Sequence, residues 1–132
     1  MPKCIFCSIV QGEEPAQIVY EDPQSLAFLD KYPQSRGHLQ LIPKKHYPRI
    51  YEIPEMGAFF TVAGRVIRAI IPVLGADHVT IATFGRQVTH AHLWIVPQYD
   101  REGEIKEGFG RKTTREEQKE LVRALRVALK GV

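Results

Sequence analysis

The sequence predicts a single α+β domain over residues 1–132, with a largely antiparallel five-stranded sheet, a central helix and a C-terminal helix. Two observations predict this class. Short segments rich in β-branched, aromatic and leucine residues alternate with turn residues, and most connections between them are of hairpin length. In the middle of the chain the apolar spacing changes to three and four residues, which is typical of a helix. A chain of 132 residues is long enough to bury one core but not two.

The strands are predicted where apolar runs stop at turn residues. Asp22, Pro23 and Gln24 fit a tight hairpin between the first two strands. Residues 32–37, which include a proline and a glycine, fit a longer loop before the third strand. The last two strands follow the central helix. The five predicted strands cover residues 18–21, 25–30, 38–43, 78–84 and 89–96.

Two helices are predicted from apolar side chains that recur on one helical face. The central helix begins after Pro54, and we expect Pro72 and Gly75 to end it. The C-terminal helix begins at a capping box in which Thr113 lies three residues before Glu116. The apolar positions are Phe59, Phe60, Val62, Val66, Ile67 and Ile70 in the central helix, and Leu121, Leu125, Ala128 and Val132 in the C-terminal helix.

The composition limits the kinds of partner that the protein is expected to bind. The chain has 44% hydrophobic and 25% charged residues, which is ordinary for a globular protein. Its net charge of +3 comes from scattered basic pairs such as Lys44 and Lys45, so we expect no specific nucleic-acid partner. No apolar run approaches the ~20 residues of a membrane helix, and the first residues do not resemble a signal peptide. We therefore expect a cytoplasmic protein without a membrane partner.

The most informative segment begins at Gly85 and ends at Pro97, and it contains two histidines two residues apart. On a strand, His90, His92 and Trp94 share one face, while the apolar residues between them point to the core. Neutral imidazole is a good nucleophile near pH 7, since its unperturbed pKa is about 6.5. The structural alternative is a strand histidine that simply bonds a backbone carbonyl.

The same segment reads Gly-x-Gln-Val-x-His-x-His-x-Trp-Ile-Val-Pro, which resembles the active-site strand of the histidine-triad (HIT) superfamily of nucleotidyl hydrolases and transferases. Earlier motifs, among them the Cys4-x-x-Cys7 pair, resemble bacterial Hint-type members in order and spacing, so the likeness spans roughly residues 4–97. Trp94 stands where the family has a histidine or, in the transferase branch, a glutamine. The segment just before Gly85 is also shorter than in Hint-type members and lacks the asparagine they use near the phosphates.

The resemblance implies a role for each matching residue. His92 is expected to attack the α-phosphate of a nucleotide and form a nucleotidyl-histidine, which splits a difficult displacement into two easier ones. Asp30 is expected to bind the ribose hydroxyls, because a carboxylate can accept two hydrogen bonds from a diol. For the apolar residues matched to the base site, a plain core role explains the sequence equally well. The implied catalytic group is His92, His90 and Gln87, and the implied nucleotide-binding group is Asp30, Ile5, Phe6, Ile9, Phe28, His38, Gly85 and Trp94.

Cys4 and Cys7 are the two cysteines of the chain, separated by two residues. In a reducing compartment such a pair more often binds a metal or does redox work than forms a structural disulfide. Because no strand precedes the pair, a thioredoxin-like redox role ranks second. The resemblance implies that Cys4, Cys7, His46 and His90 form a Cys2His2 zinc site, which would be structural because all four positions are filled by protein. The alternative for His46 is a surface residue beside two lysines.

Two functions follow from these patterns. The first is an enzyme, a nucleotidyl hydrolase or transferase that acts on a purine nucleotide or nucleotide conjugate. The resemblance also implies a homodimer, paired through the central helix and an adjoining strand. The alternative is a catalytically impaired nucleotide-binding or zinc-stabilised interaction protein. Trp94 favours this alternative, because its indole offers one donor, no acceptor and no proton that it can exchange near pH 7.

Overall fold

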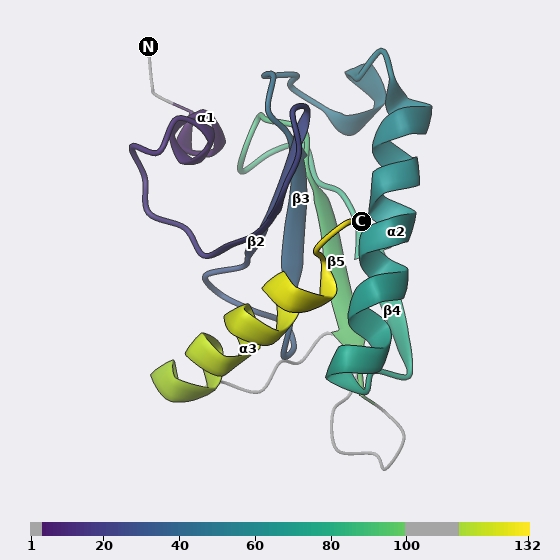
Figure 1. The fold of residues 1–132 in the computed structure, drawn as a ribbon. Coiled ribbons are helices and arrows are strands. Elements are labelled where there is room, and N and C mark those ends of the chain that lie inside the picture. Colours follow the sequence, from purple (N-terminus) through teal and green to yellow (C-terminus); the bar gives the residue numbers. More distant parts are fainter. Residues whose placement is uncertain (1–3, 100–113) are drawn as a thin grey trace.

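Five strands form one antiparallel sheet in the order β1-β2-β3-β5-β4 in the computed structural model, which describes residues 4–99 and 114–132 (Figure 1). This arrangement, with one long helix between β3 and β4 and another near the C-terminus, confirms the predicted α+β fold. The strands are β1 Ile18–Glu21, β2 Ser25–Leu29, β3 Leu39–Pro43, β4 His78–Ala82 and β5 Leu93–Gln98; the helices are α1 Ile5–Val10, the 3₁₀ turn η1 Ile50–Glu52, α2 Met56–Leu74 and α3 Arg115–Ala128.

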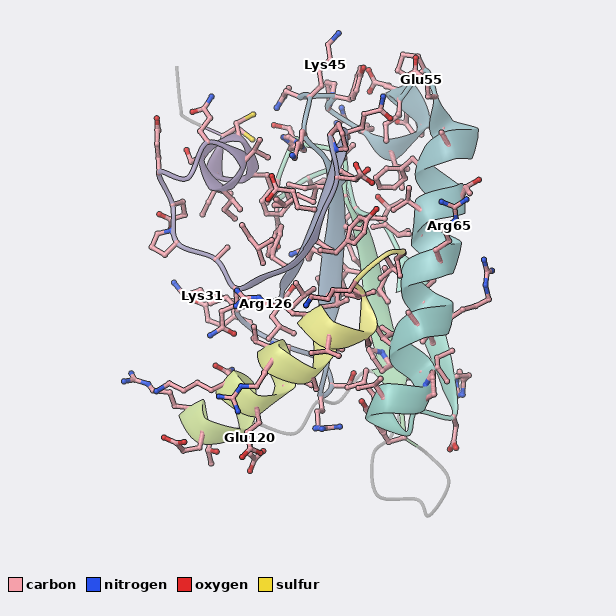
Figure 2. All side chains as sticks on the ribbon, in the orientation of Figure 1. Lys31, Lys45, Glu55, Arg65, Glu120 and Arg126 are labelled. Carbon is pink, nitrogen blue, oxygen red and sulfur yellow. The ribbon has the colours of Figure 1, made fainter. Side chains whose placement is uncertain are left out.

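Helices α1 and α2 lie on opposite sides of the sheet (Figure 1). Alternate residues of a strand point to opposite faces, so Leu39 and Leu41 of β3 join the large core under α2 and α3, while Ile42 faces α1. Charged side chains such as Lys45, Arg65 and Glu120 project from the surface (Figure 2). The smaller core under α1 consists of Phe6, Ile9, Leu26, Phe28 and Ile42.

The sequence predicted that Pro72 would help to end the central helix, and this is wrong: α2 runs through Pro72 to Leu74. A proline this near the C-terminus removes one backbone hydrogen bond, and the following residues still complete the last turn. Gly75 ends the helix as predicted, with a left-handed φ of 69° and its N–H bonded to the Ile71 carbonyl at 2.9 Å.

By length and composition alone, α2 could cross a membrane, because it has 19 residues and a mean hydropathy of 1.6. The sequence predicted no apolar run of this length. The buried stripe of α2, which includes Val66 and Ile70, belongs to the large core of the domain. Core helices of soluble proteins pass the same test, so a single helix of this kind is weak evidence for a membrane span.

Strand β5 begins at Leu93 rather than at residue 89, so His90 and His92 precede the strand instead of lying on it. The backbone before Leu93 has other partners than the neighbouring strands. The Ala91 N–H bonds to the carbonyl of Tyr47 at 2.6 Å, and the His90 carbonyl is used by the His92 ring. Ladder pairing with β3 therefore starts only at Leu93.

Two helix starts also differ from expectation. Helix α1 was not predicted from the sequence; its N-cap is Cys4, whose sulfur accepts the Cys7 N–H at 3.4 Å. At α3 the predicted cap, Thr113, lies outside the described residues, and the hydroxyl of Thr114 accepts the Glu117 N–H at 3.1 Å. The N-cap is therefore Thr114, one residue later than predicted, and the helix itself is as predicted.

Candidate functional site

Four predicted metal ligands converge between α1 and the segment before β5. The Sγ atoms of Cys4 and Cys7 and the Nδ1 atoms of His46 and His90 all lie within 4.8 Å of one another. The His90 Nδ1 is 3.4 Å from the Cys4 Sγ and 3.1 Å from the His46 Nδ1. Tetrahedral zinc, with Zn–S of about 2.3 Å and Zn–N of about 2.0–2.1 Å, places its ligand atoms about 3.3–3.8 Å apart. The four ligand atoms fit such an ion.

Hydrogen bonding fixes which nitrogen of His90 faces the cluster. The buried Nε2 lies 2.9 Å from the carbonyl of Pro43, which can only accept, so Nε2 carries the proton. The Nδ1 lone pair is thus directed at the thiols, as a metal ligand requires. Burial lowers the pKa of His90, although the bond to Pro43 opposes this effect. Burial and the adjacent Cys4 thiol raise the pKa of Cys7 to about 11.

The His92 ring is held by two backbone groups. Its Nδ1 lies 2.8 Å from the His90 carbonyl, so Nδ1 donates a proton to this bond. Its Nε2 is then unprotonated, and it accepts the Phe84 N–H at 3.2 Å. The side chain is 4% exposed. This tautomer puts a lone pair on Nε2, the nitrogen that a nucleophilic histidine would use.

Aromatic rings border His92 on two sides. The Phe6 ring of α1 lies edge-on to the rings of His90 and His92, with 5.8 Å between centroids in each case. On the other side the Phe84 ring stacks on His92 at 6.3 Å and meets Trp94 edge-on at 4.8 Å. Trp94 in turn lies 4.6 Å from the ring of His38. Rings from other parts of the chain therefore connect His90, His92 and Trp94, the three side chains expected on one strand face.

His38 connects this row of rings to Asp30. Its Nδ1 accepts the Gln34 N–H at 3.0 Å, so the neutral ring carries its proton on Nε2, which lies 3.5 Å from the Asp30 Oδ2. That distance is within ion-pair range, but the geometry is too poor for a hydrogen bond. Burial lowers the pKa of His38, and the nearby Asp30 charge partly opposes this effect.

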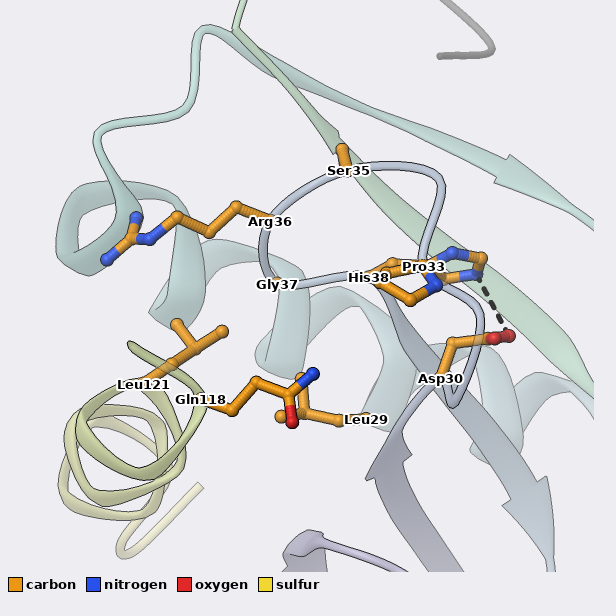
Figure 3. Close-up of a pocket in the computed structure, with 9 residues that line it drawn as sticks. All are labelled: Leu29, Asp30, Pro33, Ser35, Arg36, Gly37, His38, Gln118 and Leu121. Atoms are coloured by element: carbon orange, nitrogen blue, oxygen red, sulfur yellow. Dashed lines mark ion pairs between the residues drawn. The ribbon is translucent and has the colours of Figure 1, made fainter. Parts of the chain in front are cut away.

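The Asp30 carboxylate already has partners. Its Oδ1 accepts the Tyr32 N–H at 2.7 Å, and its Oδ2 accepts from the Gln40 amide at 2.9 Å. Each carboxylate oxygen has two lone pairs, so both can accept further hydrogen bonds. A small pocket extends from Asp30 and His38 toward Gln118 of α3 (Figure 3). Asp30 thus lies at the edge of a hollow, oriented by a side-chain amide and a backbone amide.

The remaining predicted residues are less closely grouped. Gly85 and Gln87 lie on the loop between β4 and β5, where Gln87 is exposed. Within the described parts of the chain, the Gln87 amide makes no hydrogen bond to His92. Phe6, Ile9 and Phe28 are buried in the smaller core, as the structural alternative expected, whereas Ile5 is 47% exposed. Contact of these four residues with a base stays a prediction.

Sequence reasoning missed Phe84 and Arg49. Phe84 directly precedes the motif that begins at Gly85, and an aromatic residue at the end of a predicted strand was a usable signal. Arg49 donates from Nη2 to the Gly85 carbonyl at 3.1 Å. A Cβ at Gly85 would lie 3.0 Å from the Arg49 Nε, so a glycine allows this close approach. Nothing in the local sequence pattern around Arg49 predicted this contact.

Comparison with known proteins identifies the family. A model of the HIT domain family matches residues 11–101. This chain belongs to the HIT family. Among HIT relatives, adenylylsulfatase HINT3 of Arabidopsis thaliana is 35% identical over 106 residues, which are 75% of this chain and 54% of that protein. The chain thus spans about half the length of the plant protein.

Two further HIT proteins show the range of the family. Adenosine 5′-monophosphoramidase hnt1 of Schizosaccharomyces pombe is 34% identical over 105 residues, which cover 75% of this chain and 77% of the yeast protein. The crystal structure of a zinc-bound histidine triad family protein from Mycobacterium smegmatis aligns with a TM-score of 0.80 and 36% identity. That alignment covers 96% of this chain and 93% of the mycobacterial chain.

Proposed function

We propose that this HIT protein is a nucleotidyl hydrolase or transferase that acts at the α-phosphate of a purine nucleotide conjugate. The observation that carries the proposal is the tautomer of His92, because its Nδ1–H bond to the His90 carbonyl leaves a lone pair on Nε2. The names of two relatives, an adenylylsulfatase and an adenosine 5′-monophosphoramidase, support an adenine nucleotide with a leaving group on its phosphate.

The reaction proceeds in two displacements. The His92 Nε2 attacks the α-phosphorus while the bond from phosphorus to the leaving group breaks, and the leaving group departs with the electron pair and then takes a proton from water. Water, or an acceptor hydroxyl in a transferase, next attacks the phosphorus. The N–P bond breaks, the attacking oxygen loses its proton, and the lone pair returns to Nε2. Nδ1 keeps its proton throughout, and the His90 carbonyl stabilises the positive charge on the ring.

Other residues bind the substrate in this proposal. Asp30 accepts hydrogen bonds from the two ribose hydroxyls, supported by the amide of Gln40 and the ring of His38. Gln87 and the backbone amide of Gly85 contact the phosphate, from the loop that follows Phe84. Electrostatic stabilisation by such donors is worth roughly 10²- to 10³-fold each in acyl-transfer enzymes.

We further propose that Cys4, Cys7, His46 and His90 hold zinc. The convergence of the four ligand atoms and the zinc-bound mycobacterial relative support this assignment. When bound, zinc would tether α1 to the segment that carries His92, and its role would be structural. The chain's own residues carry the chemistry.

We also propose that the protein is a homodimer that pairs through α2 and β4. β4 is an edge strand, and its burial pattern is largely half-exposed or exposed. Ile81 on β4 and Val73 on α2 are 49% and 44% exposed, which favours an apolar contact surface. Sedimentation equilibrium of the wild type and of Ile81→Glu tests this proposal; a monomeric wild type would contradict it.

A turnover assay tests the proposed function. Wild-type protein is incubated with adenosine 5′-phosphoramidate and with adenylyl sulfate, and release of AMP is followed. His92→Ala should abolish release while nucleotide binding persists, whereas Tyr51→Leu, at an exposed residue outside the proposed site and dimer surface, should leave turnover unchanged. Wild-type rates in His92→Ala would exclude the mechanism.

A second candidate function is nucleotide binding without efficient turnover. It is favoured by Trp94, which replaces the third triad residue and cannot exchange a proton near pH 7. Tight nucleotide binding by the wild type with no AMP release from either donor would support this candidate.

A further inference from the structure

The Nε2 lone pair of His92 is already occupied. An imidazole nitrogen that carries no proton has a single in-plane lone pair, and here the Phe84 N–H takes it at 3.2 Å. A phosphorus atom that approached Nε2 would meet this N–H first. In this structure His92 has the right tautomer for attack, but its nucleophilic nitrogen is covered.

Phe84 is held over His92 by its own ring as well as by its backbone. The ring stacks on His92 with 6.3 Å between centroids and an interplanar angle of 22°. Its other neighbour is Trp94, which it meets edge-on at 4.8 Å. Phe84 is 51% exposed, so no core packing fixes it in place. These two ring contacts act together with the hydrogen bonds of the neighbouring residues to keep the Phe84 backbone near Nε2.

Trp94 itself is well anchored. It lies on β5, paired with Gln40 of β3 and Ala82 of β4, and its ring also packs on the buried His38. Within the described residues, its ring contacts are to His38 and Phe84 rather than to His92. The ring contacts therefore link Trp94 to His92 through Phe84.

The ends of the covering segment are fixed to the rest of the domain. The Thr83 hydroxyl donates to the His92 carbonyl at 2.6 Å, and Arg49 donates to the Gly85 carbonyl at 3.1 Å. Phe84 lies between these two anchors, so a change that frees Nε2 would be confined to this short segment.

We propose that Phe84 and Trp94 form an aromatic latch, in which Trp94 is a positioning residue that holds the Phe84 amide on the His92 Nε2 and controls access of electrophiles to it. The latch gives Trp94 a role other than the lost proton transfer of a third triad residue. Its consequence for turnover rests on the proposed function: the α-phosphate reaches Nε2 only after Phe84 withdraws. The covering of Nε2 stands independently of any substrate.

Acylation by diethyl pyrocarbonate measures this access without a nucleotide, because the reagent modifies unprotonated imidazole nitrogens. The rate at His92 is determined by peptide mass spectrometry relative to N-acetylhistidine added to the same sample. An aromatic contact shifts such an opening equilibrium by about 2- to 10-fold. We expect Phe84→Leu and Trp94→Ala each to accelerate His92 modification by about this factor. Trp94→Phe should restore most of the slow rate, and Tyr51→Leu, at an exposed aromatic residue elsewhere, should leave it unchanged.

Each outcome decides a specific part of the latch. Acceleration in Phe84→Leu with none in a folded Trp94→Ala would overturn the role of Trp94. No acceleration in Phe84→Leu would overturn the latch altogether, and this variant tests it even if Trp94→Ala does not fold. Hydrogen exchange at the Phe84 amide gives a second readout, since it should be faster in Trp94→Ala. Faster His92 modification in the variants of a protein that never turns over nucleotides would support the latch and refute the proposed function. Turnover by the wild type with no change in His92 modification in the variants would support the proposed function and refute the latch.

Discussion

The backbone carbonyl of His90 accepts the Nδ1–H of His92 at 2.8 Å, while the His90 ring directs its own Nδ1 toward the thiols of Cys4 and Cys7. One residue therefore belongs to both the candidate metal site and the candidate nucleophile. The Phe6 ring, from the same helix as Cys7, packs on both histidines. The candidate metal site and the candidate nucleophile are thus in direct contact.

Removal of a cysteine ligand tests the metal site. Wild-type protein purified without added metal should contain about one zinc per chain, and Cys4→Ser should lose it. We expect the midpoint of thermal unfolding to fall by several degrees in Cys4→Ser, because α1 loses its tether to His46 and His90. His78→Ala should retain both the metal and the midpoint. A metal-free wild type, together with an unchanged midpoint of thermal unfolding in Cys4→Ser, would rule out the proposed metal site.

Asp30→Asn tests ribose recognition. The amide keeps one acceptor oxygen for the Tyr32 N–H but loses the charge and an oxygen that binds Gln40. Nucleotide affinity should fall by roughly 1–3 kcal/mol, as measured by calorimetry with AMP. The matched ligand is the 2′,3′-dideoxy nucleotide, which should bind wild type and Asp30→Asn almost equally. Equal losses with both ligands would show that Asp30 acts through the fold and not through the ribose.

Trp94→His restores a histidine at the third triad position. General acid–base assistance is typically worth 10²- to 10⁴-fold, so we expect AMP release to rise by at least about an order of magnitude. The same substitution removes the ring that contacts Phe84. Trp94→Ala separates the two effects, since it opens the latch without adding a proton donor. Equal rates of AMP release in both variants would assign the whole gain to the latch. No gain in either variant would show that Trp94 does not limit turnover.

His38 should make stability depend on pH. Burial lowers its pKa in the folded protein, so the unfolded chain binds a proton more readily below a pH of about 6.5. The free energy of unfolding should therefore fall as the pH drops below about 6.5 and continue to fall until the lowered pKa is reached. Asp30 is the charged group beside the ring, and it limits the size of the effect. In His38→Asn this part of the slope should disappear in denaturant titrations at pH 5–8; an unchanged slope would contradict it.

Much of the fold follows from local sequence. The strand at 18–21, the turn at Asp22 and the helix end at Gly75 each depend on residues within a few positions, and all three are as predicted. The start of β5 could not be predicted in this way. It depends on the Tyr47 carbonyl, which is distant in sequence and competes with the sheet for the Ala91 N–H.

The sequence predicted which residues form the candidate site better than it predicted the contacts between them. Motif spacing and the family resemblance identified His90, His92 and the cysteine pair, and the structure brings the four predicted ligand atoms together. Long-range contacts of the loop before Gly85 were not accessible from spacing. The Phe84 N–H on His92 and the Arg49 bond to Gly85 arise from the path of that loop in three dimensions.

Identification of the covalent intermediate tests the central proposal most directly. Wild-type protein is mixed with adenylyl sulfate for a single turnover, quenched with base to preserve the acid-labile N–P bond, and digested for mass spectrometry. We expect an adenylyl group on the peptide that contains His92, attached to the imidazole, and none in His92→Ala. AMP release by the wild type with no adduct on His92 at any time, or with an adduct on another residue, would contradict the proposal.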